Sequence, residues 1–169
     1  MTFYWVTDER KHSGSGPLDT MLYNTAGKEI KKVTRKFAER IRMEGTGRLS
    51  DGRLLNVDDR SKCDYGTNNF KCFKDITKIS DWGFGNRDNN LVPYISVASN
   101  VIGHGKLVEI KQLIGMPLPG TNNLKHNGCF RVDDECGSCE QSTHVFDFFA
   151  GREEYYPPIE NRLSKYLVD

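Results

Sequence analysis

The segment that most constrains the fold is 130–149, FRVDDECGSCEQSTHVFDFF, which reads as two short apolar strands that each carry a carboxylate. Asp134 leaves the first strand, and Asp147 lies inside the second among valine and phenylalanine side chains. Desolvation there would raise a carboxyl pKa, as a general acid near neutral pH requires. We therefore expect neighbouring strands that bring both aspartates to a functional site. The alternative for Asp147 is a solvent-facing position on an edge strand.

A chain of 169 residues with 37% hydrophobic and 28% charged residues is expected to fold as one domain, residues 1–169. The net charge of +1 argues against a dedicated nucleic-acid binder, which carries an excess of basic residues. No stretch approaches the ~20 apolar residues of a membrane span. The first residues, MTFYWVTDERKH, lack the apolar core of a signal peptide. We predict a monomer without cofactor, metal or membrane span.

Five cysteines leave one thiol over if the others form disulfides. Cys63 and Cys72 flank a short polar loop that a disulfide would close. The other three fall around the carboxylates: Cys129, Cys136 and Cys139. Together with His144 these three offer the alternative of a tetrahedral zinc site. Disulfides are favoured because the segment reads as strands, and they indicate a periplasmic or extracellular protein.

Apolar residues at helical spacing predict an amphipathic helix over residues 28–42, which a Gly-Thr-Gly sequence ends. Residues 48–57 are expected to form a hairpin, and the polar segment 58–90 an irregular insertion. Residues 151–169 form a tail that is expected to end helically after two prolines. Further strands are predicted at 2–6, 91–99 and 106–110. Many short strands separated by turns indicate a small barrel.

Several pieces of the chain resemble one known family. In order, ISVASNVIGHGKLVEI, HNGCFRVDDECGS and HVFDFF are similar to the 3D domain of MltA-type lytic transglycosylases, which is related to barwin, expansins and family-45 endoglucanases. EGTGRLSDGRLLNV resembles the glycine-threonine/serine-glycine segment of these proteins, and TFYW their first barrel strand. The resemblance implies a mainly β fold, a six-stranded double-psi β-barrel with one amphipathic helix and the irregular insertion.

The resemblance also assigns roles to the two aspartates. Asp147 aligns with the catalytic acid/base of the family, and Asp134 with its strand partner, although Asp133 is an adjacent alternative. The first of the three family aspartates is missing, since Ala-Ser-Asn occupies its neighbourhood at 98–100. The two catalytic candidates are therefore Asp147 and Asp134.

The residues expected to contact substrate are Tyr4, Asp8, Thr46, Gly47 and His144. Glycines around Thr46 let a ligand approach closely, and an ordinary tight turn is the alternative. Asp8 would be the base of an inverting hydrolase, and the alternative is that it is an ordinary turn residue. Tyr4 would offer an aromatic face to a sugar, and the alternative is that its ring packs in the core. His144 would tune Asp147 or lie on the other face of the strand.

The function that the resemblance implies is a lytic transglycosylase acting on the MurNAc–GlcNAc bonds of peptidoglycan. One acid protonates the glycosidic oxygen, and the same group then serves as a base while the 6-hydroxyl of the sugar attacks C1. A non-catalytic, expansin-like wall-binding module is one alternative, which the missing aspartate favours. An inverting hydrolase acting on another polysaccharide is a second. Delivery into a competitor as an antibacterial effector is compatible with the enzymatic interpretation.

Overall fold

The structure is a computed structural model that describes residues 1–58, 63, 71–137, 139 and 145–166, with side chains of the last helix described up to residue 161. The described chain is mainly β and also contains two α-helices. It divides into two compact units: unit 1 comprises Met1–Trp5 and Phe84–Asp169, and unit 2 comprises Val6–Gly83. This division into units does not test the prediction of a single domain, which stays a prediction.

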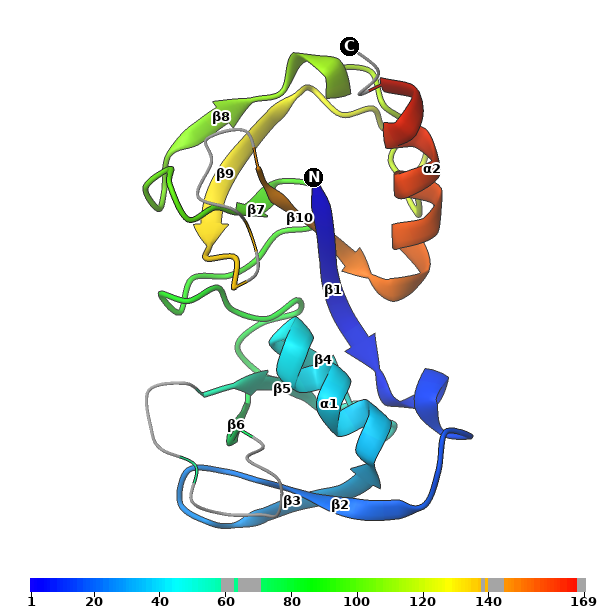
Figure 1. The fold of residues 1–169 in the computed structure, drawn as a ribbon, viewed down its shortest axis with the longest axis vertical. Helices are drawn as coiled ribbons and strands as arrows, with labels where there is room; N and C mark the ends of the chain where they lie inside the picture. Colours follow the sequence, from blue (N-terminus) through cyan, green and yellow to red (C-terminus); the bar gives the residue numbers. More distant parts are fainter. Residues whose placement is uncertain (59–62, 64–70, 138, 140–144, 167–169) are drawn as a thin grey trace. The chain divides into compact units, whose positions relative to one another are not determined.

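Unit 2 combines a β-hairpin, a helix and short strands (Figure 1). Hydrogen bonding joins its strands in the order β6-β5-β4-β1, and β2 pairs with β3 separately. The contact of β4 with β1 is parallel, and the others are antiparallel. The elements are the end of β1 (Thr2–Asp8), η1 (Glu9–His12), β2 (Leu18–Tyr23), β3 (Glu29–Thr34), α1 (Arg35–Glu44), β4 (Thr46–Arg48), β5 (Leu54–Val57) and β6 (Phe73–Asp75). The core of the unit includes Leu22, Val33, Phe37, Ile41, Leu55 and Phe73.

The helix predicted over residues 28–42 is wrong in its first half, because β3 occupies Glu29–Thr34 and α1 begins only at Arg35. The apolar spacing also suits a strand that is buried by pairing with β2, a partner that local periodicity does not reveal. Thr34 ends the strand and caps the helix, since its hydroxyl accepts a hydrogen bond from the N–H of Phe37 at 3.3 Å. The helix ends at Gly45, whose φ of 81° suits glycine, as predicted.

The hairpin predicted over residues 48–57 is confirmed. β4 and β5 pair antiparallel, and Gly52 adopts a φ of 93° in the turn between them. The segment 58–90 is less irregular than predicted, because it contributes β6 to the strands of unit 2. The boundary between the two units also falls within this segment, after Gly83. Its residues 59–62 and 64–70 lie outside the described part of the chain.

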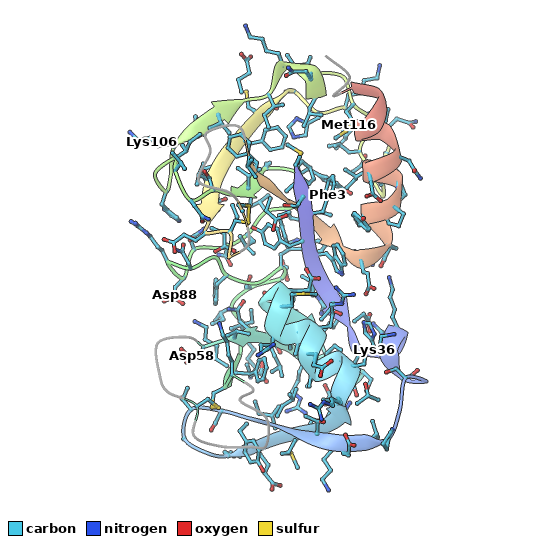
Figure 2. All side chains as sticks on the ribbon, in the orientation of Figure 1. Phe3, Lys36, Asp58, Asp88, Lys106 and Met116 are labelled. Carbon is cyan, nitrogen blue, oxygen red and sulfur yellow. A yellow bond between two sulfur atoms is a disulfide. The ribbon has the colours of Figure 1, made fainter. Side chains whose placement is uncertain are left out.

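Unit 1 is arranged around the short central strand β7 (Figure 1). β7 pairs antiparallel with β10 and parallel with β9, and β9 pairs antiparallel with β8. The elements are the start of β1, β7 (Ser96–Ala98), β8 (Leu107–Glu109), η2 (Lys111–Leu113), β9 (Cys129–Asp134), β10 (Asp147–Arg152), η3 (Glu153–Tyr155) and α2 (Tyr156–Tyr166). Phe130, Phe148 and Met116 belong to its core. Phe3 packs against this core, and Figure 2 labels Phe3 and Met116.

The strand predicted over residues 91–99 is reduced to the three residues of β7. A turn at Pro93 and Tyr94, where Tyr94 has a φ of 66°, interrupts the extended run before Ser96. Proline cannot donate a hydrogen bond to a neighbouring strand, which explains why pairing starts after it. The strand predicted at 106–110 is confirmed as β8, and both carboxylate strands are confirmed as β9 and β10. The tail forms η3 and α2, with its two prolines in the first turn of the helix.

Two disulfides cross-link the chain. The predicted Cys63–Cys72 bond is present, and Cys136 bonds to Cys139, which leaves Cys129 as an exposed thiol. The described helices include none with the length and apolar character needed to cross a membrane.

We expect one reactive thiol in the folded, oxidised protein and five after denaturation and reduction. Cys129 is exposed and therefore open to a thiol-specific reagent, whereas the other four cysteines are bonded in pairs. Quantitative thiol labelling checks this, and Cys129→Ser is the control that should show no thiol before reduction. More than one labelled thiol in the folded, oxidised protein would contradict one of the two disulfides.

Candidate active site

Unit 1 brings the two predicted catalytic aspartates to opposite sides of one residue. Asp147, the first residue of β10, pairs with Ala98 of β7, and Asp134, the last residue of β9, pairs with Ala98 from the other side. The expectation that β9 and β10 are direct neighbours is therefore wrong, because β7 lies between them. Two strand spacings separate the aspartate backbones, roughly 10 Å. Ala98 contributes only a methyl group, so the residue between them adds little bulk.

Asp147 sits in a largely dry environment. Burial raises the pKa of its carboxyl to about 6, and a hydrogen bond from the hydroxyl of Thr2 acts in the opposite direction. Its Oδ1 is buried and accepts no hydrogen bond from the described residues. Its Oδ2 lies 4.0 Å from Sγ of Cys136, which carries no proton in a disulfide and so only excludes water. The carboxyl therefore keeps one buried oxygen without a hydrogen-bond donor from the described residues.

Asp134 is held differently. Burial raises the pKa of its carboxyl to about 6, and the negative charges of Asp147 and Glu135 add to this effect. Its Oδ1 accepts hydrogen bonds from the backbone N–H groups of Asn86 at 2.8 Å and of Glu135 at 2.9 Å, which favour the ionised form. Of the two carboxyls, Asp134 is thus better supplied with donors for a negative charge.

A glycine makes this support possible. Gly85 lies against the backbone carbonyl of Asp133, and a Cβ at position 85 would collide with that oxygen. Only glycine therefore allows the segment to come close enough for the next residue, Asn86, to donate its N–H to Asp134. Sequence reasoning did not single out Gly85 or Asn86, because they are far from Asp134 in the chain, Asn86 by 48 residues.

The adjacent alternative, Asp133, is a buried structural residue. Its carboxylate accepts hydrogen bonds from the guanidinium of Arg131, at 2.6 and 3.0 Å, and from the hydroxyl of Ser96. Alternation along β9 directs it away from the side on which Asp134 lies. With both oxygens occupied, Asp133 is less suited to proton transfer than Asp134.

Tyr4 lies close to the two carboxyls with its ring in the core of unit 1. The ring packs on Phe149 with centroids 5.0 Å apart and is only 8% exposed, so it offers no open face for sugar stacking. Burial and the charges of Asp134 and Asp147 raise the pKa of its hydroxyl well above the usual value. The hydroxyl is buried and has no hydrogen-bond partner among the described residues. It is therefore a neutral donor beside the acidic pair.

A pocket of about 410 Å³ opens beside Asp134, entirely within unit 1. Its lining is mostly polar and carries charges of both signs. The polar lining residues include Asn86, Arg87, Asn100, His104, Asp134 and Glu135. Only Asp134 among them was predicted as a site residue. The turn at residues 103–105 was visible as Gly-His-Gly, but nothing in the local pattern indicated that His104 faces a pocket.

The remaining predicted site residues belong to unit 2 or lie outside the described chain. Thr46 donates its hydroxyl to Oδ1 of Asn56 at 2.8 Å. Gly47 leaves space that the side chain of Ile41 fills, since a Cβ there would come within 2.6 Å of it. Asp8 caps η1, and Arg10 binds its carboxylate through two side-chain nitrogens, at 3.0 and 2.9 Å. Their contacts with substrate stay predictions, and His144 falls in the undescribed residues.

Asp8 differs electrostatically from the acidic pair. Burial tends to raise its pKa, but the hydrogen bonds and charge of Arg10 outweigh this and lower the pKa below its ordinary value. A carboxylate held in this way is a weak base. The zinc alternative also loses two of its ligands, because Cys136 and Cys139 are bonded to each other. Within the described ranges, no three histidine, cysteine or acidic residues gather as a metal site.

We expect Asp147→Asn to stabilise the protein at neutral pH and to change little in acid. Folding raises the pKa of this carboxyl from 3.8 to about 6. The group therefore contributes fully to the stability of the folded protein below its ordinary pKa, and this contribution is lost as the pH rises through 6. The substitution removes the charge, so it should raise the free energy of unfolding by on the order of 1–3 kcal/mol at about pH 7.5 and by near zero at about pH 4. Denaturant unfolding at both pH values measures this.

Asp51→Asn is the control, and its effect on stability at neutral pH should have the opposite sign. A hydrogen bond from Arg53 lowers the pKa of Asp51, so its contribution is present above the ordinary pKa and is lost as pH falls. This variant should lose stability at neutral pH and not in acid. An Asp147→Asn protein that is destabilised at neutral pH would contradict the buried, poorly solvated state of this carboxyl.

Comparisons of the chain with known protein families, with curated proteins and with solved structures found no match. The geometry and electrostatics of the site are therefore what indicate its chemistry.

Proposed function

We propose that this protein cleaves the glycan strands of peptidoglycan as a lytic transglycosylase, with Asp147 as the acid/base. The observation that carries the proposal is the Asp147 carboxyl, whose pKa of about 6 coincides with a buried Oδ1 that accepts no hydrogen bond from the described residues. Such a group is half protonated at about pH 6 and has an oxygen that accepts no hydrogen bond from the described residues. These are the properties that a general acid needs.

The two carboxyls have different catalytic roles in this proposal because they have different hydrogen-bond donors. Asp134 receives two backbone N–H bonds, which favour its ionised form, whereas Oδ1 of Asp147 accepts none from the described residues, so we assign the negative charge to Asp134 and the proton to Asp147. Asp147 gives its proton to the glycosidic oxygen as the bond to C1 breaks. The ionised Asp134 stabilises the positive charge that develops on the sugar. Asp147 then takes the proton of the 6-hydroxyl as that oxygen bonds to C1, which closes a 1,6-anhydro ring.

For the fold we propose the six-stranded double-psi β-barrel that the resemblance implies. Parallel pairs in a mainly β chain support it, namely β1 with β4 and β7 with β9, because hairpins alone produce antiparallel pairs. For the location we propose the periplasm or the extracellular space. The two disulfides support this, because they persist in oxidising compartments.

Asp147→Asn should abolish most turnover on purified peptidoglycan while binding to the wall and folding are kept. The amide preserves shape and removes the titratable proton, and general acid–base catalysis contributes about 10²–10⁴-fold. Release of soluble glycan, wall pull-down and thermal melting measure the three properties. Asp51→Asn, a matched change at an exposed position, should remain fully active.

Mass spectrometry of the products distinguishes the reaction classes. Products with 1,6-anhydro ends, lighter by one water molecule than hydrolysis products, support the transglycosylase. Reducing ends indicate a hydrolase. A wall that is bound but never cut supports the expansin-like module, which the missing family aspartate favours. Cleavage of cellulose or chitin with peptidoglycan left intact would refute the substrate.

The rate at low substrate concentration should fall about tenfold per pH unit above pH 6. The acid must be protonated in the free enzyme, and kcat/KM reports the pKa of that group, about 6 for Asp147. A profile of kcat/KM from acid to alkaline pH checks this. A rate that climbs steadily through neutral pH would contradict the assignment and indicate an ionised base instead.

A further inference from the structure

We propose that Asn100 is a positioning residue for the acid/base: its side-chain amide holds the Cys136–Cys139 disulfide against the carboxyl group of Asp147. The inference deepens the proposed function and rests on it where catalysis is concerned. The structural part, the seating of a disulfide over a carboxyl, can be tested without any substrate.

Asn100 binds the disulfide segment through three hydrogen bonds. Its Oδ1 accepts the N–H of Cys136 at 3.0 Å, and its Nδ2 donates to the carbonyl oxygen of Cys136 at 2.6 Å and to that of Cys139 at 3.3 Å. Only an amide supplies acceptor and donors together, since a carboxylate has no N–H to offer the two carbonyls. An aspartate at this position would therefore lose two of the three bonds and repel both carbonyl oxygens. The side chain thus matches this segment as an asparagine and not as an acid.

The disulfide in turn covers Asp147. Sγ of Cys136 lies 4.0 Å from Oδ2 of Asp147, and Cys136 is only 4% exposed. A bonded sulfur has no proton to donate, so its effect on the carboxylate is to keep water away and not to stabilise the charge. Withdrawal of the disulfide would admit water to Oδ2 and make the ionised form easier to reach. Asn100 acts on Asp147 through this chain of contacts and not by touching it.

Other groups also face Asp147 and set the background for a test. The hydroxyl of Thr2 and the amino group of Met1 lower its pKa. The charge of Asp134 and the hydroxyl of Tyr4 interact with it electrostatically. None of these four groups is bonded to Asn100 in the described structure. The side-chain contacts that lead from Asn100 to Asp147 therefore run through the disulfide.

Asn100 also lines the pocket beside Asp134, so loss of activity alone would not identify its role. The decisive measurement is the titration of the Asp147 carboxyl in the substrate-free protein by carbon-13 NMR, with Asp147→Asn to assign the signal. In Asn100→Ala we expect the titration midpoint to fall from about 6 towards the ordinary value. Asn122→Ala, on an exposed loop of the same unit, should leave it unchanged. An unchanged midpoint in folded Asn100→Ala would overturn the proposal.

A second variant keeps the test decisive if Asn100→Ala does not fold. Cys136→Ala/Cys139→Ala removes the disulfide and should lower the midpoint by itself. If Asn100 acts through the disulfide, the triple variant should show no further change, since the effects of residues in one chain of contacts do not add. Additive changes, or no change in the cysteine variant, would overturn the inference.

Activity separates this inference from the proposed function. If the midpoint moves and peptidoglycan is cut, the alkaline limb of the pH profile should move to lower pH by the same amount in Asn100→Ala. If the midpoint moves but no variant cuts peptidoglycan, the positioning stands and the proposed function fails.

Discussion

Ala98 of β7 pairs with Asp147 on one side and with Asp134 on the other, and the surroundings of both aspartates follow from this arrangement. Two carboxyl groups across one small residue repel each other when ionised, and burial removes most of the water that would screen them. Ionisation of Asp147 therefore makes ionisation of Asp134 less favourable. The groups that contact each carboxyl influence which of the two ionises more readily.

The two carboxyls differ in the groups that contact them, and Asp134 has more backbone donors than Asp147. Asp134 receives backbone N–H groups from Glu135 and from Asn86, and the second of these depends on a glycine at position 85. Asp147 is covered instead by a disulfide sulfur and leaves one oxygen with no donor in the described structure. In the proposed mechanism the donors to Asp134 favour its ionised form and the burial of Asp147 favours its protonated form, which is the pairing that acid/base catalysis uses.

The neighbourhood in which the resemblance expects a third aspartate carries an amide in this chain. Asn100 occupies the neighbourhood of the missing acid, and its amide is engaged with Cys136 and Cys139. The cysteines that made a zinc site an alternative are the same ones that form this disulfide. Asn100 and the CGSC sequence are thus parts of one structural feature, although Asn100 lies 36 residues before Cys136.

Short-range patterns in the sequence determined the strands that carry Asp134 and Asp147, the hairpin at 48–57 and the Cys63–Cys72 bond, since alternation, turn glycines and loop closure act over a few residues. Only the tertiary structure decided that β3 precedes α1, that β7 separates the carboxylate strands, and that Asn86 and Asn100 belong to the site. The physical reason is that each of these features depends on a hydrogen-bonded partner far away in the chain. A local pattern of apolar and polar residues fits several such partners equally well, and the packing of the whole unit selects one.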